Sequence, residues 1–268
     1  MEILVCVKRV PTVGGAITLT ADRRAIDTKA SGFTISPHEE CAVEEAVRLV
    51  ERFGGSVTVA TLGPAVAEEQ LRACLALGAS AAVLVETEPG AEVGPIATAA
   101  MLHSVAAAAT AARGGFDLVL LGNEASDTGD YQVGIRLAHL LGWPAATGIK
   151  ALAVDDAAGS VSASRTYRGV LETFALELPC VVTVKEGINL PRYPSLPGRL
   201  RAKRAAITRV PGPGGSSDGP PPVPLAQDVR MTSLRVPDAP KKQATVLGRG
   251  PGAVPALVDV LVQLGVVS

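Results

Sequence analysis

Residues Asp117–Gly134 read DLVLLGNEASDTGDYQVG, and this stretch decides the fold class of the chain. Its first part, Asp117–Gly122, is an apolar run after a Gly-Gly pair, which is typical of a buried parallel strand. A small polar loop follows over 123–129, and apolar residues at helical spacing resume over 130–141. A strand that leads through a polar loop into a helix predicts an anion site, because the helix start offers free N–H groups and a positive dipole end.

The polar loop supplies side chains that suit a nucleotide ligand. They are short and carry hydroxyl, carboxylate or amide groups that form hydrogen bonds. The stretch matches neither G-x-G-x-x-G nor the P-loop pattern, so an ordinary βα loop with a capping Asp127 is an equally good interpretation of it alone. The candidate nucleotide contacts in this loop are Ser126, Asp127, Thr128, Gly129 and Gln132.

The rest of the first half repeats the same alternation of strands and helices. Apolar strands are predicted over 3–7, 56–62 and 81–85, each followed later by a segment with helical spacing. This order predicts an α/β protein with a doubly wound, mostly parallel, Rossmann-like sheet and right-handed crossovers.

Two further features of the first half point to one edge of that sheet. Lys8 and Arg9 follow the first strand directly, where open α/β sheets bind ligands; a pair of solvated charges is the less favoured interpretation. Ser36, Pro37 and Glu39 form a capping-box pattern that predicts the start of a helix. His38 is interpreted as a surface or first-turn residue of this helix, because the sequence identifies no nucleophile or acid to pair with it as a catalytic base.

The second half predicts elements added to this domain. Short strands at 161–167 and 171–176 predict a β-hairpin that joins the sheet, around a turn at 168–169. Prolines over 191–198 predict an exposed, stiff loop in which Leu196 suits partner docking. Composition alone favours the other interpretation, a connecting loop with a solvated basic flank.

Proline, glycine and serine content divides the chain into parts. The C-terminal part offers one strand at 231–236 and one helix at 253–264, which are too small to form a core and must dock elsewhere. The linker that precedes this C-terminal part is too poor in apolar residues to pack. The predicted parts are the α/β domain 1–205, with its hairpin and a loop region at about 186–204, the linker 206–230 and the C-terminal arm 231–268.

Composition argues against several functions. The net charge is −1 and aromatic residues make up 3%, which argues against nucleic-acid binding. The sequence shows neither cysteine or histidine spacing for a metal nor a nucleophile–base pair, so we predict no metal ligand and no catalytic residue. The Ala-rich stretch 96–112 contains His103 and Ser104 and predicts a buried helix rather than an integral membrane segment. We expect a soluble cytoplasmic protein.

Six motifs, in the family's order, resemble the small (beta) subunit of electron transfer flavoproteins along nearly the whole chain. They occupy the first strand, the first helix, the polar loop, the hairpin, the strand after it and the proline-rich loop. The motifs span 3–10, 36–46, 122–134, 165–173, 178–182 and 191–197.

The resemblance implies an electron carrier subunit rather than an enzyme. In that family the small subunit pairs with a large (alpha) subunit that carries the redox-active FAD. The heterodimer accepts electrons from flavin dehydrogenases and passes them to an acceptor such as a quinone oxidoreductase. The small subunit binds AMP in its α/β domain, or a second FAD in electron-bifurcating members; the bulk of Tyr131 in the loop favours AMP. A stand-alone adenine-nucleotide-binding domain is a further alternative, which leaves the hairpin, the proline-rich loop and the arm unexplained.

The resemblance also implies which residues hold the nucleotide. Cys6 is expected to contact the adenine through its backbone, Leu62 to lie beside the adenosine, and 127–134 to wrap the phosphate. Together with the residues named above, the candidate cofactor-binding residues are Cys6, Lys8, Ser36, Pro37, His38, Glu39, Leu62, Gly122, Ser126, Asp127, Thr128, Gly129, Asp130, Tyr131, Gln132, Val133 and Gly134.

Partner docking is implied at two places. The loop 191–198 corresponds to the segment that anchors on flavin dehydrogenases, with Leu196 as the anchoring leucine, and the C-terminal arm corresponds to one that reaches across to the large subunit. Arg165 and Arg168 either place positive charge beside a reduced flavin or pair with acids across the interface. The candidate docking residues are Arg165, Arg168, Tyr193, Leu196 and Pro197.

Overall fold

A seven-stranded parallel sheet forms the centre of the computed structural model, which describes residues 1–12, 14, 17–29, 31–212, 229, 231–237 and 244–267. The strand order is β12-β5-β4-β1-β6-β11-β7. From the central β1 the chain adds β4 and β5 on one side and then returns to add β6 on the other, which places a topological switch point between β1 and β6. The strands are β1 (Glu2–Cys6), β4 (Ser56–Gly63), β5 (Ala81–Glu86), β6 (Leu118–Gly122), β7 (Ala145–Ile149), β11 (Cys180–Val184) and β12 (Thr208–Pro211).

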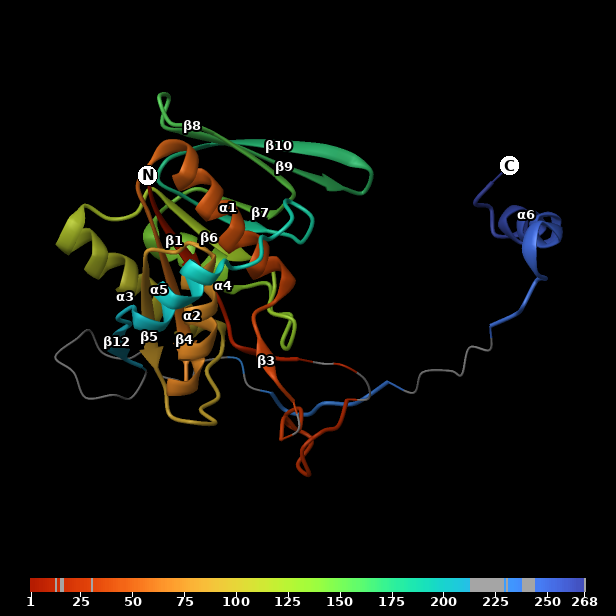
Figure 1. Cartoon of the computed structure of the whole chain (residues 1–268), viewed down its shortest axis with the longest axis horizontal. Coiled ribbons are helices and arrows are strands. Elements are labelled where there is room, and N and C mark those ends of the chain that lie inside the picture. Colours follow the sequence, from red (N-terminus) through yellow and green to blue (C-terminus); the bar gives the residue numbers. More distant parts are fainter. Residues whose placement is uncertain are drawn as a thin grey trace.

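Helices cover both faces of this sheet, as the predicted doubly wound fold requires (Figure 1). The central strand shows the alternation: Ile3 and Val5 pack with α1 and α2, whereas Leu4 and Cys6 pack with α3 and α4. The fold class predicted from the sequence is therefore confirmed. The helices are α1 (Pro37–Phe53), α2 (Glu68–Leu77), α3 (Pro95–Arg113), α4 (Val133–Leu141) and α5 (Leu196–Arg204), with a short 3-10 helix η1 (Ala65–Ala67) before α2.

One helix among the described residues, α3, is long and apolar enough to cross a membrane by length and composition alone. The core helix of a soluble protein passes the same test. In this structure α3 packs on the sheet through Ala99, Leu102 and Ala106. This packing is the one expected of the buried helix that the sequence predicts.

The predicted hairpin forms, but it belongs to a separate sheet. β9 (Ser160–Tyr167) and β10 (Val170–Glu177) are antiparallel, and their turn residues Arg168 and Gly169 have φ of 48° and 79°, as a two-residue hairpin turn requires. The prediction that the hairpin joins the main sheet is wrong. An additional strand directly after β7, β8 (Ala151–Asp155), pairs with β9 and completes an antiparallel sheet in the order β10-β9-β8.

The proline-rich loop is shorter than predicted, because α5 starts inside it. Ser195 is the N-cap of α5 and accepts a hydrogen bond from the Gly198 N–H, while Pro197 sits in the first turn, where its missing N–H costs nothing. At the other end Arg72 of α2 donates to the carbonyls of Ala202 and Ala205, which caps the C-terminus of α5. The segment is thus fastened to α2.

The chain beyond α5 also departs from the prediction. β12 lies inside the range assigned to the linker and pairs with β5, while residues 213–228 and 230 of that range lie outside the described residues. No strand forms over 231–237; the Met231 N–H instead donates to Glu92 Oε1 at 2.7 Å. The predicted C-terminal helix is present. The remaining elements are β2 (Val10–Pro11) paired with β3 (Phe33–Thr34), η3 (Gly250–Ala253) and α6 (Val254–Gln263).

Candidate functional site

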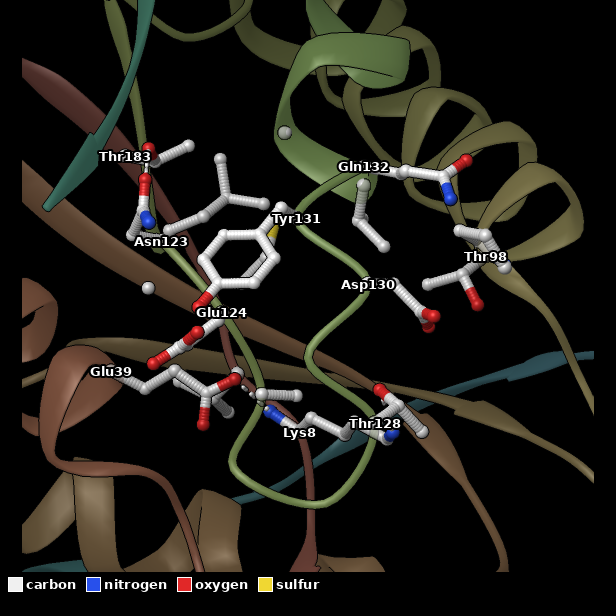
Figure 2. A pocket seen from close by; sticks show the side chains of 18 of the residues that line it. Lys8, Glu39, Thr98, Asn123, Glu124, Thr128, Asp130, Tyr131, Gln132 and Thr183 are labelled. Atoms are coloured by element: carbon white, nitrogen blue, oxygen red, sulfur yellow. Dashed lines mark hydrogen bonds between the residues drawn. The ribbon is translucent and has the colours of Figure 1, made fainter. Parts of the chain in front are cut away.

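A cavity of about 490 Å³ opens at the carboxyl ends of the central strands. Lys8 after β1, Leu62 in β4 and Gly122 in β6 line it, so it lies at the switch point where open α/β sheets bind ligands. The first residues of α3 and α4, Pro95 and Val133, line the side opposite these strand ends. Figure 2 shows the loop before α4 running through this cavity.

The structure brings most of the predicted nucleotide residues together around this cavity. Those that line it are Cys6, Lys8, Glu39, Leu62, Gly122, Thr128, Asp130, Tyr131, Gln132, Val133 and Gly134. The others are not among the residues that line the cavity; they belong to the start of α1 and to the loop before α4. They are Ser36, Pro37, His38, Ser126, Asp127 and Gly129.

The first turn of α1 is built by a complete capping box. The backbone N–H of Glu39 donates to Ser36 Oγ at 3.4 Å, and the N–H of Ser36 donates to Glu39 Oε2 at 2.9 Å. The second carboxylate oxygen of Glu39 accepts from the Lys8 N–H at 3.0 Å. Burial raises the pKa of the Glu39 carboxyl to about 8. The hydrogen bonds from Ser36 and Lys8 lower this pKa, but their effect is smaller than that of burial. Glu39 therefore ties the end of β1 to the start of α1.

His38 keeps the position in the first turn that the sequence predicted. Its Nδ1 is buried without a hydrogen-bond partner, and burial lowers the pKa of the imidazole. The thiol of Cys6, at the end of β1, has a pKa raised by burial and then by the charge of Glu39. A thiol in this state is a poor nucleophile, so the position suits packing rather than covalent chemistry.

Lys8 reaches from β1 to the loop on the opposite side of the cavity. Its Nζ lies 2.8 Å from Asp127 Oδ1 and donates to Thr128 Oγ1 at 3.3 Å. The Lys8 side chain keeps 40% of its exposure. The ammonium group is thus positioned by the loop while a face of it stays available to an anion.

Two glycines allow the elements around the cavity to approach closely. A Cβ at Gly122 would lie 2.7 Å from Glu39 Cγ and 3.1 Å from the Glu39 nitrogen. A Cβ at Gly134, in the first turn of α4, would lie 2.5 Å from Thr183 Cγ2 of β11. A Cβ at Gly134 would require the Thr183 side chain to move, and one at Gly122 would require the first turn of α1 to give way.

The start of α4 leaves its first N–H groups without a side-chain cap. Gln132 occupies the N-cap position, but its Oε1 accepts from Arg136 at 2.8 Å, and no side-chain cap hydrogen bond forms there. The N-cap of α3, Gly94, likewise provides no side-chain cap. Two helix starts therefore direct positive dipole ends and N–H groups to one cavity, which suits a phosphate.

In the loop before α4, the side chains of Tyr131 and Asp130 point to different sides of the cavity. Tyr131 has φ of 56°, an uncommon value for a residue with a side chain, and its side chain is half exposed. In Figure 2 the Tyr131 ring points toward Asn123 and Glu124, whereas Asp130 points to the other side of the loop, toward Thr98. The ring therefore forms part of the wall rather than packing in the core.

The cavity continues past the switch point to residues that the sequence analysis did not assign to it. Thr183 donates to Asn123 Oδ1 at 2.9 Å and accepts from the Gly148 N–H at 3.0 Å, so polar groups at the ends of β6, β7 and β11 form one network. Lys185, directly after β11, also lines the cavity. The sequence could have predicted that these residues line the cavity only if the positions of β11 and β7 in the sheet had been known.

Arg165 was predicted to face a partner, and the structure places it in the cavity wall. Its guanidinium donates to Glu172 Oε2 at 2.7 Å and to the Thr147 carbonyl at 2.8 Å. It also lies over the rings of Tyr167 and Phe174, at 5.6 and 5.2 Å from their centroids. These intrachain contacts hold its charge beside the cavity. Arg168, at the hairpin turn, lies 5.2 Å from the Tyr167 ring centroid.

The other predicted docking residues are exposed on a segment that is fastened at both ends. We call residues 189–200 the docking segment. Tyr193 is 94% exposed and Leu196 71%, and Pro197 is also exposed. Leu190 and Leu200 add further exposed apolar surface. A folded protein seldom displays a group of large apolar side chains unless they serve an interface.

The loop between β5 and α3, which was not predicted from the sequence as part of the site, also lines the cavity. This loop carries no motif, and its contribution depends on where β5 ends in the sheet. Among the described residues, no group of three or more His, Cys, Asp or Glu side chains is arranged to hold a metal ion. The cavity residues from this loop and the start of α3 are Thr87, Glu88, Gly90, Ala91, Val93, Gly94, Pro95 and Thr98.

The doubly wound parallel sheet, with a cavity at its switch point, defines the class of open α/β proteins. The family model "Electron transfer flavoprotein domain" matches residues 24–213. The electron transfer flavoprotein subunit beta of Homo sapiens is 34% identical over 250 residues, which covers 92% of both chains. The mitochondrial beta subunit of Oryza sativa subsp. indica is 34% identical over 252 residues, covering 92% of this chain and 93% of the relative. That of Bacillus subtilis is 36% identical over 211 residues, covering 78% and 79%.

The chain therefore belongs to the electron transfer flavoprotein family, as a beta subunit. Beta subunits of this family are electron carriers rather than enzymes, as the resemblance implied, and a beta subunit implies an alpha subunit as its partner.

Proposed function

We propose that this chain binds AMP in the cavity and forms, with an alpha subunit that carries FAD, a heterodimeric carrier between flavin dehydrogenases and an acceptor such as a quinone oxidoreductase. The observation that carries the nucleotide assignment is the cavity itself, where Lys8 and two helix starts face one another across the switch point. The FAD supplies the redox chemistry when it is bound. The residues of this chain hold and orient the nucleotide and dock the partner proteins. A cytoplasmic location accompanies this proposal.

A second FAD in place of AMP is the alternative that one observation favours. The cavity does not end at the phosphate loop after β6; it extends one strand further, to Thr183 and Lys185 at β11, and to Arg165 on the second sheet. A ligand longer than AMP would use those polar and cationic groups. The bulk of Tyr131 in the wall between the two ends supports AMP instead.

The number of nucleotides released from the purified complex tests the proposal. The chain is co-expressed with its alpha subunit, the complex is denatured, and FAD and AMP are quantified per heterodimer. One FAD and one AMP support the proposal, whereas two FAD and no AMP support the alternative. A complex that holds no flavin would contradict the electron-carrier function.

Replacing Lys8 with methionine is expected to weaken AMP binding by about fivefold to tenfold, because one charge-assisted contact to the phosphate is lost and Asp127 is left unpaired beside it. AMP retention by the purified heterodimer, measured by equilibrium dialysis, provides the test. Lys185→Met is the matched control, because it removes the same charge from the same cavity at β11. If K185M weakened nucleotide binding as much as K8M, the ligand would extend to β11, as a second FAD would.

Replacing Leu196 with alanine is expected to raise the KM of a flavin dehydrogenase reaction for the heterodimer by about fivefold, with kcat unchanged, because an exposed apolar anchor is lost without any change in the redox centre. Steady-state reduction of the complex by the dehydrogenase gives both constants. Val66→Ala, which truncates an exposed apolar side chain outside the docking segment, is the control and leaves the KM unchanged. An unchanged KM in L196A would exclude docking through this leucine.

A further inference from the structure

The docking segment is held in place by one arginine, which the sequence analysis did not single out. The guanidinium of Arg192 spans two carboxylates of α1, lying 2.9 Å from Glu44 Oε2 through Nε and 2.6 Å from Glu51 Oε1 through Nη1. Two further bonds run from Nη2 to Glu44 Oε1 at 3.1 Å and to Glu51 Oε2 at 2.9 Å. Arg192 thus forms a fork with each carboxylate, the geometry that an arginine provides and a lysine does not.

The backbone of the segment is fastened to the same helix. The Arg192 N–H donates to Glu44 Oε2 at 3.1 Å. Three residues earlier, Asn189 Nδ2 donates to the Cys41 carbonyl at 3.0 Å and to Glu45 Oε2 at 2.9 Å. The segment is therefore attached to successive turns of α1 before it enters α5.

The contacts of Arg192 are partly shielded from water. The side chain of Glu44 keeps 6% of its exposure and that of Arg192 34%. The outer pair is more open, since the side chain of Glu51 keeps 55%. The hydrogen bonds that Arg192 donates to Glu51 and Glu44 raise the pKa of Arg192, and the same bond to Glu51 lowers the pKa of Glu51. Arg192 and Glu51 thus remain charged across the ordinary pH range.

We infer that Arg192 is a positioning residue for partner docking: it fixes the segment on α1 so that Tyr193 and Leu196 stand exposed in one conformation before the partner arrives. An exposed apolar segment without such a clamp would collapse or fluctuate, and ordering it would cost affinity at each encounter. This inference rests on the proposed docking of flavin dehydrogenases.

The test compares two substitutions of the clamp with one elsewhere, all in the purified heterodimer. Arg192→Gln removes the charge and both forks, whereas Arg192→Lys keeps the charge but cannot hold both carboxylates in the fork geometry. Arg209→Gln is the control, since Arg209 also joins two carboxylates, Glu68 and Glu86, between α2 and β5.

Two readouts separate positioning from a merely structural role. Hydrogen exchange of the backbone amide at position 192, which donates to Glu44 Oε2, is expected to accelerate about tenfold in R192Q and R192K and to stay unchanged in R209Q. The KM of a purified flavin dehydrogenase for the heterodimer is expected to rise about fivefold in both clamp variants, with kcat unchanged.

Unchanged exchange of the amide at position 192 in R192Q would overturn the inference. So would faster exchange with an unchanged KM, because the segment would then dock without being positioned. If L196A also left the KM unchanged, the proposed docking surface itself would fail. That result would be distinguishable, because the exchange measurement needs no dehydrogenase.

Discussion

Gly122→Ala is expected to lower the free energy of unfolding by about 2–3 kcal/mol, the upper part of the range for overpacking a well-packed site. The new Cβ would lie 2.7 Å from Glu39 Cγ and 3.1 Å from both the Glu39 nitrogen and His38 Cβ. The obstacle is therefore largely the first turn of a helix, and a rotamer change cannot remove it.

The first turn of α1 cannot move aside without breaking other contacts. Glu39 is tied to Ser36 and to the Lys8 N–H, and Ser36 Oγ also donates to the Glu124 carbonyl at 3.3 Å. Displacing this turn shifts Lys8 at the end of β1, so AMP retention is expected to fall about tenfold or more alongside stability. Urea unfolding and equilibrium dialysis measure the two effects.

Gly32→Ala serves as the control for Gly122→Ala. A Cβ at Gly32 meets nothing closer than Thr12 Oγ1 at 3.8 Å, which is ordinary contact. Its effect on stability is expected to be below about 1 kcal/mol, the usual cost or gain of a tolerated glycine replacement. If G122A were as stable as G32A, the close packing of β6 against α1 would not limit this site.

Local sequence signals predicted the parts of the site that local structure determines. The Ser36-Pro-His-Glu39 pattern predicted a capping box, and the structure contains both of its hydrogen bonds. The apolar run before Gly122 predicted the strand, and the polar loop and the helical spacing after it predicted the helix that follows, which starts at Val133. In each case the information lies within a few residues of the element.

The missed parts depend on contacts between distant segments. Arg165 is 18 residues from Thr147, whose carbonyl it binds, so no local pattern could place it in the cavity wall. β12 is short and follows basic residues, and it becomes a strand because the edge of β5 is free to pair with it. The fold class followed from the alternation of strands and helices, whereas the extent of the cavity required the strand order.

Raising the pH from about 5 to 8.5 is expected to destabilise the protein through Glu39. The pKa of this carboxyl is raised from 4.5 to about 8 in the folded state, chiefly by burial. Between these values the folded state binds more protons than the unfolded state, so the stabilisation is fully present below pH 4.5 and is lost as the pH rises through 8. At 1.36 kcal/mol per pKa unit, the full difference corresponds to about 3–5 kcal/mol.

The comparison of wild type with Glu39→Gln isolates this carboxyl from others that titrate. Burial lowers the pKa of His38, which acts in the opposite direction, and raises that of Glu40, which acts in the same direction as Glu39. Both groups remain in E39Q, so the difference between the two pH profiles, obtained by urea unfolding, belongs to Glu39. The Glu39 carboxyl oxygens accept hydrogen bonds from two backbone N–H groups. In E39Q the NH2 group of the glutamine would face one of these donors and leave it without an acceptor, so E39Q is expected to be less stable at pH 5. Its stability should nevertheless fall less steeply toward pH 8.5. Parallel profiles would mean that Glu39 ionises near its ordinary pKa, held by the two N–H donors rather than by burial.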